Sequence, residues 1–494
     1  MTDSNNLVPL RPLDNCWRIE EATAASIIID AEDYFRFARS AMLKARYRIM
    51  LIGWDFDARI SLKRSPNPDQ APEKVGDFIY WLVERNPGLE VYLLRWDFGA
   101  LNIAMRGSTI FAILKWMRHP RIHTKLDSDH PPEASHHQKI VVIDDCFAFC
   151  GGIDMTSDRW DTRGHHDNDP GRRQPNGKPY KPWHDATTAL AGPVAKALGD
   201  HSRDRWIRAG GAPIKAITGH NDCWPEDLPV DFPKSAVGIA RTAPKMEGRD
   251  AVIEVERLYL DQIANAQRWI YAESQYFASR KIAEAIGRRL DETNGPEIVL
   301  INPVKAEGWL QPIAMDSARA RLHEVLRHRD RHHRFRIYHP YTAGGEAIYV
   351  HAKVLIVDDH SIRVGSSNMN NRSLRLDTEC DVTIDTMLSQ NASFGPTIGR
   401  IRNGLLAEHL GADIGTVDAQ LCRTGSLIET IEHLRGPGKT LRPYLEPELS
   451  ATKTWLADNE VLDPEGPGNE FEGMARGGLF RRLRRKPRSP SKVC

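Results

Sequence analysis

The chain has 494 residues, of which 41% are hydrophobic and 27% are charged, and its formal net charge at pH 7 is +1. The length predicts two to four domains, and the composition is ordinary for a globular protein. Because the charges balance, no global basic field points to a nucleic-acid partner. No run approaches the roughly 18 apolar residues of a membrane helix, so no transmembrane segment is predicted.

The first residues are polar and lack the basic start and apolar core of a secretory signal. We expect residues 1–15 to be disordered and the protein to be cytoplasmic or peripheral to a membrane; export by a route that needs no classical signal stays open. Seven cysteines, from Cys16 to Cys494, include no CxxC pair and suit free thiols in a reducing compartment. No Cys/His cluster has zinc-ligand spacing, so neither a metal nor a cofactor is expected.

Three pairs of similar segments recur in the same order: 45–52 with 266–273, 91–94 with 298–301, and the segments led by His137 and His351. The members of each pair lie 207 to 221 residues apart. Offsets in so narrow a band indicate a duplicated unit. Helix-like and strand-like patterns alternate within each half. They predict an α/β fold of two duplicated mixed-sheet units, related by a pseudo-two-fold axis, with the active site at their interface.

The predicted organisation is a first unit at 16–212, a linker at 213–248, a second unit at 249–415, a C-terminal extension at 416–470 and a basic disordered tail at 471–494. Residues 162–182 are polar and rich in Gly, Pro, His and Asn. They predict a long loop that is either functional, as a lid or binding surface, or a solvated insertion. The tail carries seven basic residues between Arg481 and Lys492. It is either a solvated end or a segment attracted to an anionic membrane surface.

The strongest chemical signal is a motif that occurs twice. In each copy a lysine follows a histidine by two residues, an aspartate by seven and a glycine by fourteen: His137, Lys139, Asp144 and Gly151, then His351, Lys353, Asp358 and Gly365. One copy would be weak, because roughly a few per cent of chains this long match it by chance. Two copies at the repeat offset are strong evidence of a shared site.

The residues after each lysine are β-branched or apolar, which predicts that both motifs lie on strands. Side chains alternate along a strand, so His137 and Lys139 share one face, as do His351 and Lys353. Two imidazoles and two ammonium groups suit a phosphodiester. The lysines offset the charge on the phosphate oxygens, one imidazole attacks phosphorus, and the other protonates the leaving alkoxide. Water or another alcohol then cleaves the phosphohistidine.

The aspartates of the two motifs have a different expected role. Asp144 and Asp358 lie seven residues after the histidines, so on a continuous strand their side chains would point to the opposite face. Each also begins an Asp-Asp pair between two strand-like runs. A hairpin turn is expected there. We therefore interpret both aspartates, together with the motif glycines Gly151 and Gly365, as structural rather than catalytic.

These motifs resemble those of the phospholipase D superfamily, over about Trp17 to Gly411. Flanking segments resemble its eukaryote-like, lipid-cleaving branch: 151–154, 159–162, 182–185, 271–277, 371–373, 377–379 and 408–411. The resemblance implies that His137 is the nucleophile and His351 the general acid. It further implies that Asp185 and Glu379 orient the two imidazoles.

The resemblance also assigns phosphate binding and shows departures. Ser366 and Asn368 match the additional phosphate donors of the second motif, whereas the first motif has Gly152 and Asp154 there, a departure shared by the lipid-cleaving branch. Ser274 replaces the usual asparagine of a Glu-Asn-Gln-Tyr-Phe stretch. The chain also leaves no room for the amino-terminal lipid-binding modules of the large eukaryotic enzymes, so a bacterial-type chain is expected.

The expected function is a phospholipase D that hydrolyses glycerophospholipids at a membrane surface, with transfer to an alcohol as a second outcome. The alternatives are a phosphatidyltransferase, as in cardiolipin or phosphatidylserine synthesis, a nuclease, and a pseudoenzyme that only binds lipid. Neutral composition disfavours a nucleic-acid partner, and the intact His–Lys pairs disfavour a pseudoenzyme. Head-group preference, the balance of hydrolysis and transfer, and the oligomeric state stay open.

Overall fold

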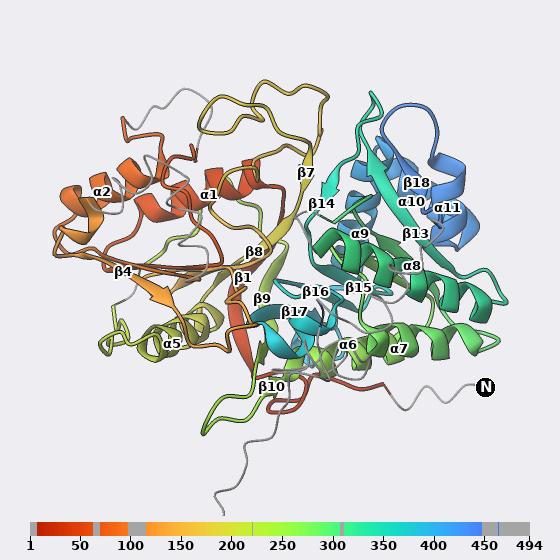
Figure 1. Cartoon of the computed structure of the whole chain (residues 1–494), viewed down its shortest axis with the longest axis horizontal. Coiled ribbons are helices and arrows are strands. Elements are labelled where there is room, and N and C mark those ends of the chain that lie inside the picture. Colours follow the sequence, from red (N-terminus) through yellow and green to blue (C-terminus); the bar gives the residue numbers. More distant parts are fainter. Residues whose placement is uncertain are drawn as a thin grey trace, which may run out of the picture.

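The computed structural model describes residues 7–62, 70–96, 115–219, 221–306, 311–446 and 463. They form an α/β protein built on one mixed sheet, in which sixteen strands are defined within these ranges (Figure 1). The first half of the chain, red to yellow in Figure 1, lies on one side of the sheet's middle, and the second half, green to blue, lies on the other. The predicted α/β class and duplication are confirmed.

The first half contributes seven strands of the large sheet, in the order β1-β8-β6-β5-β2-β3-β4. Its elements are β1 Arg18–Ile29, α1 Ala31–Leu43, β2 Arg48–Gly53, α2 Val75–Arg85, β3 Glu90–Trp96, β4 Ile122–Asp127, β5 Ile140–Ile143, β6 Phe147–Gly151, β7 Trp183–His184, β8 Ala186–Ala191 and α5 Pro193–Arg208. β2, β3 and β4 run parallel, whereas β5, β6, β8 and β1 join through antiparallel pairs.

The second half repeats this order as β9-β17-β16-β15-β11-β12-β13, extended by β18. Its elements are β9 Phe232–Ala243, β10 Val252–Ile253, α6 Glu254–Asn265, β11 Trp269–Glu273, α7 Arg280–Asp291, β12 Glu297–Ile301, α8 Gln311–Arg329, β13 Phe335–Tyr341, β14 Tyr349–Val350, β15 Val354–Val357, β16 Ser361–Gly365, a π-helical turn Arg372–Leu376, β17 Glu379–Asp385, a 3-10 turn Ser389–Asn391, α9 Gly395–Leu410, α10 Ile414–Thr424, α11 Leu427–Leu434 and β18 Thr440–Pro443. The equivalent strands β1 and β9 pair with each other at the centre, antiparallel, as a pseudo-two-fold axis requires.

Helices cover both faces of the sheet. On one face α1 and α2 pack on the first half, and α6 and α7 pack on the second half, in two separate apolar cores. On the other face α5 and α9 share one core that crosses the middle of the sheet, with Leu198, Leu405 and Val299 among its members. Burial of apolar surface across this shared core holds the two halves together.

The structure differs from the predicted linker at 213–248. Residues 232–243 of that range form β9, a twelve-residue strand in the middle of the sheet that pairs with β1 and β17. The strand begins beside Pro233 and contains Gly238, and both residue types weaken a strand signal in the sequence. Part of the predicted extension at 416–470 also belongs to the fold, because β18 adds to the sheet beside β13.

Residues 7–15, part of the segment 1–15 that was predicted to be disordered, contact the folded protein. The Val8 amide donates to the Asn265 side chain, and Asn15 is buried. The basic tail at 471–494 lies outside the described residues. Within the described ranges, none of the helices combines the length and apolar character needed to cross a bilayer.

The motif aspartates sit at matching hairpin turns. Asp144 follows β5 and Asp358 follows β15, each with a positive φ of 51°. The Asp144 carboxylate accepts hydrogen bonds from three consecutive amides, those of residues 46–48, and Asp358 does the same for residues 267–269. Each carboxylate thus ties its hairpin to the start of the neighbouring strand, β2 or β11.

Replacing Asp144 with Ala leaves three consecutive amides at and just before the start of β2 without their acceptor, and that of Arg48 is buried. We expect the free energy of unfolding to fall by about 2–4 kcal/mol, as for lost hydrogen bonds to a buried charge. Chemical denaturation measures it. Asp204→Ala, which removes an exposed i,i+4 ion pair on α5, is the matched control with an expected change near zero. Equal stability of Asp144→Ala and the wild type would contradict the structural role.

Candidate active site

Both motif histidines line one pocket of about 320 Å³ at the junction of the halves. His137 and Lys139 lie in the extended segment that leads into β5, and His351 and Lys353 lie in the equivalent segment that leads into β15. The duplication therefore places two equivalent His–Lys pairs at the junction of the two halves.

Short parallel bridges between the halves set each histidine beside its partner. His136 bridges to Thr378, and the next residues along, His137 and Glu379, are neighbours as a result. On the other side β14 lies beside β7 (Figure 1) and Val350 pairs with His184, so His351 follows beside Asp185. The amides of the two histidines donate to the carbonyls of Thr378 and His184, at 3.1 and 2.8 Å.

Each imidazole contacts a carboxylate from the other half of the chain. His137 Nδ1 lies 3.0 Å from both carboxylate oxygens of Glu379, and His351 Nδ1 lies 2.7 Å from Asp185 Oδ2. With Nδ1 engaged, Nε2 is the ring nitrogen left to face a substrate. Because the two dyads are crossed, the site exists only when the halves are packed together.

Burial and neighbouring cations set the charge of these groups. Burial, followed by Lys139 and Lys353, holds the pKa of His137 well below its usual value. The pKa of His351 is likewise lowered, first by burial and then by Lys353 and Arg159. Both rings are therefore neutral near pH 7, the state in which an imidazole nitrogen is nucleophilic.

Burial also shifts the pKa values of Glu379 and Lys353, in each case toward the neutral form. Burial raises the pKa of Glu379 to about 8, opposed by Lys139, and lowers the pKa of Lys353 to about 7, opposed by Asp185. Lys139 Nζ donates to the carbonyl of His137 at 2.6 Å, and Lys353 Nζ donates to the carbonyl of His351. Perturbed groups of this kind gather at functional sites, where burial and like charges are placed against one another.

The proposed phosphate donors differ in their surroundings. Asn368 lines the pocket, and its side-chain oxygen makes no hydrogen bond among the described residues. Ser366 is fully buried behind the dyad, where its hydroxyl donates to Glu379 Oε2 at 2.5 Å. In the first half Asp154 Oδ2 lies 3.4 Å from Lys139 Nζ, and Asp154 Oδ1 accepts a hydrogen bond from the amide of Trp54.

Aromatic side chains around the histidines were missed in the sequence. Trp54 and Trp96 stack at 5.8 Å, and Trp54 meets the ring of His137 edge-on at 6.5 Å. Trp183 lies 5.2 Å from the ring of His351, and Arg159 stands over Trp183 at 4.1 Å. The available signal was position: Trp54 directly follows β2, and Trp183 directly precedes the His184-Asp185 pair.

The predicted loop at 162–182 is tied to the protein by buried contacts. His165 Nδ1 lies 3.0 Å from Asp161, and its Nε2 lies 3.1 Å from Glu408 of α9. Arg172 is buried and donates to Asp161. These contacts argue against a merely solvated insertion, since they connect the loop to the second half of the chain.

Two groups of side chains in the described ranges could hold a metal, although none was expected from the sequence. One group is Asp30, His165, His184 and Glu408, and the other is His184, Glu273 and His409. Neither includes a motif histidine. At the motif site the two imidazoles lie beside two lysines, whose positive charge disfavours a metal ion there.

Comparisons with known proteins agree with this architecture. A family model described as "Phospholipase D" matches residues 41–284, and one described as "Cardiolipin synthase, PLD-like domain" matches residues 259–392. The sequence is 24% identical to "Phospholipase D A" of Dictyostelium discoideum over 476 residues, which cover 78% of this chain and 36% of the relative. It is 24% identical to "Phospholipase D alpha 1" of Carica papaya over 522 residues, covering 77% and 63%.

The chain thus spans 36% and 63% of the lengths of these two relatives. Among solved structures, phosphatidylserine synthase of Haemophilus influenzae Rd KW20 shares the fold, with a TM-score of 0.51 and 14% identity. The alignment covers 77% of this chain and 88% of that one. The two family models together take in both HxKxxxxD motifs. The chain belongs to the phospholipase D superfamily.

Proposed function

We propose that the protein is a phospholipase D-type phosphodiesterase. It hydrolyses glycerophospholipids, such as phosphatidylcholine or phosphatidylethanolamine, to phosphatidic acid and the free head group. The observation that carries the proposal is the crossed pair of imidazoles, His137 on Glu379 and His351 on Asp185, in the wall of one pocket. Two neutral imidazoles that share a pocket suit displacement at phosphorus in two steps. Similarity to curated phospholipases D supports the same substrate class.

In the first step His137 Nε2 attacks phosphorus. The P–N bond forms as the bond from phosphorus to the head-group oxygen breaks, and His351 gives its Nε2 proton to the leaving alkoxide. In the second step His351 removes a proton from water, whose oxygen attacks phosphorus as the P–N bond breaks. Glu379 and Asp185 hold the two rings through Nδ1 and stabilise the charge that develops on them.

As the general acid, His351 must carry a proton on Nε2 before the head group leaves. Burial and the nearby cations lower the pKa of His351 in the free protein. A phosphodiester adds a negative charge beside both motif lysines, and this raises the pKa values of His351 and Lys353. Substrate binding is therefore coupled to proton uptake, which charges the acid when it is needed.

An alcohol can replace water in the second step. Trp54, Trp183 and Tyr276 line the pocket with apolar and aromatic surface, which suits an acceptor that carries carbon as well as a hydroxyl. Transfer of the phosphatidyl group is therefore the second outcome of the same site. The acceptor chemistry, and not a different set of residues, separates a phospholipase from a phosphatidyltransferase.

Incubation with vesicles of mixed phosphatidylcholine, phosphatidylethanolamine and phosphatidylglycerol plus a primary alcohol tests the proposal. Mass spectrometry of the lipids should show phosphatidic acid and the phosphatidyl alcohol. His137→Asn and His351→Asn should each lower turnover roughly 10³-fold or more, because neither ring can replace the other. His433→Asn, an exposed site on α11, is the matched control and should retain full turnover.

Two outcomes would contradict the proposal. Cleavage of a single-stranded oligonucleotide but of none of the lipids would point to a nuclease. Lipid turnover by His137→Asn at the wild-type rate would remove that ring from the reaction.

The pH dependence of anion binding gives a second test. Because Lys353 has a pKa of about 7 in the free protein, an anion in the pocket should bind its protonated form better. The inhibition constant of tungstate should weaken by about tenfold or more per pH unit above pH 7, because at least one proton is taken up with the anion. Lys353→Arg, whose guanidinium stays charged, should reduce this slope by one proton. A constant inhibition constant from pH 6 to 9 in the wild type would contradict the coupling.

A further inference from the structure

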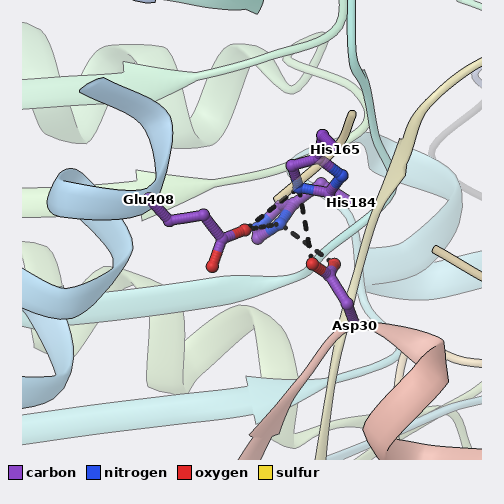
Figure 2. A group of neighbouring side chains, drawn as sticks. All are labelled: Asp30, His165, His184 and Glu408. Carbon is purple, nitrogen blue, oxygen red and sulfur yellow. Dashed lines mark hydrogen bonds and ion pairs between the residues drawn. The ribbon is translucent and has the colours of Figure 1, made fainter. Parts of the chain in front are cut away.

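Four buried side chains from distant parts of the chain converge next to the active site (Figure 2). Asp30 follows β1, His165 lies in the 162–182 loop, His184 ends β7, and Glu408 lies on α9. One ligand atom from each lies within 4.8 Å of every other. Three of the residues come from the first half of the chain and Glu408 comes from the second, so the cluster spans the junction.

The contacts in this cluster are short and mutual. His184 Nδ1 lies 2.9 Å from Glu408 Oε1 and 3.2 Å from Asp30 Oδ1. His165 Nε2 lies 3.1 Å from the same Glu408 oxygen and 3.4 Å from Asp30 Oδ2. A tetrahedral ion with bonds of about 2.0–2.1 Å separates its ligand atoms by about 3.3 Å. The four imidazole–carboxylate separations, 2.9 to 3.4 Å, involve both oxygens of Asp30 and lie close to that value.

The far nitrogen of each ring is held by another carboxylate. His165 Nδ1 lies 3.0 Å from Asp161, and His184 Nε2 lies 2.9 Å from Glu273. A proton on each of these nitrogens leaves the lone pair of the other nitrogen directed at the centre of the cluster. Metal-binding histidines are typically oriented by such a carboxylate on the opposite nitrogen.

Two polar atoms at the centre lack a hydrogen bond. His184 Nδ1 lies between two carboxylates, yet it makes no hydrogen bond of acceptable geometry, and neither does Asp30 Oδ2. Both residues are at most 1% exposed. A buried polar atom without a partner is costly, and an ion at the shared centre would satisfy both atoms together.

When both imidazole rings are neutral, the surrounding charges leave a deficit of positive charge. Four carboxylates contact the two rings, those of Asp30, Asp161, Glu273 and Glu408. Arg163 binds Glu408, and Arg172 binds Asp161. With neutral rings, these groups carry two uncompensated negative charges. Lys439, the next cation, donates to the carbonyl of Arg163 at the exposed edge.

We propose that Asp30, His165, His184 and Glu408 form a binding site for one divalent transition-metal ion, best suited to zinc. Two imidazoles and two carboxylates favour zinc over calcium or magnesium, which prefer sets made only of oxygen ligands. All four ligands come from the protein, which is typical of a structural ion. The proposal is independent of the proposed function, because none of the ligands touches the pocket.

Such an ion would position the second dyad. Asp185 directly follows His184, and its amide donates to Asp30 Oδ1 at 3.0 Å. The amide of His351 donates to the carbonyl of His184 at 2.8 Å. The ion would therefore fix the main chain that sets His351 against Asp185, while it also joins the 162–182 loop to α9.

Protons offer the competing arrangement. Burial lowers the pKa of His165 and of His184, but the carboxylates outweigh it, so both pKa values lie above the usual range without an ion. Two imidazolium rings among four carboxylates would form an ion-pair network of the same shape. The metal site predicts one bound ion per chain, whereas the ion-pair network predicts none.

Purified full-length protein is stripped with a chelator, dialysed and titrated with Co²⁺ or Zn²⁺. We expect one ion per chain by plasma mass spectrometry, the strong visible absorption of four-coordinate Co²⁺, and a melting temperature that rises with added Zn²⁺. Glu408→Gln, nearly identical in shape, and His165→Gln should lose the cobalt bands and the zinc-dependent rise. His201→Gln, a buried histidine of α5 bonded to Gln138, is the matched control and should keep both.

Absence of a stoichiometric ion from the stripped and reloaded wild type, with a melting temperature that ignores zinc, would overturn the proposal in favour of the ion-pair network. Unchanged cobalt bands in a folded Glu408→Gln would also overturn it. Circular dichroism establishes that the variants are folded. If both variants fail to fold, the wild-type titration decides alone, because its stoichiometry and spectrum need no variant.

Discussion

The crossed contact between each motif histidine and a carboxylate of the other half is the constraint on which the site depends. His137 is held by Glu379 and His351 by Asp185. The duplicated sheet makes these crossed contacts possible, because β1 and β9 pair antiparallel at its centre and bring equivalent edges of the two units together. Neither unit alone contains a complete dyad, so assembly of the halves and assembly of the site are one event.

The packing of the two halves also explains the shifted pKa values in the pocket. Packing the halves buries two lysines and two imidazoles in one place, where the dielectric constant is low and like charges oppose protonation. Burial first, and then the lysines, hold the pKa values of both rings well below the usual value. Burial lowers the pKa of Lys353 to about 7, and under the proposed function a bound phosphate group would raise it again.

Much of the site could be predicted from the sequence, because its reactive residues follow one local spacing. Each HxKxxxxD motif and the hairpin position of Asp144 depend on residues close together in the chain, and the repeat offset follows from comparing the two halves of the sequence. The strand β9 was missed because proline and glycine obscure its apolar alternation. The contact of Trp54 with His137 and the cluster of Asp30, His165, His184 and Glu408 were not predicted, because they depend on contacts between residues far apart in the chain.

The order of roles in the two dyads is tested most directly by trapping the covalent intermediate. His351→Asn, given a diester with an activated leaving group that needs no proton, should still form a phosphohistidine, since only the acid is missing. Peptide mass spectrometry should place the adduct on His137, and the reciprocal variant His137→Asn should form none. An adduct on His351 in the His137→Asn protein, with none on His137 in His351→Asn, would contradict the assignment and reverse the two roles.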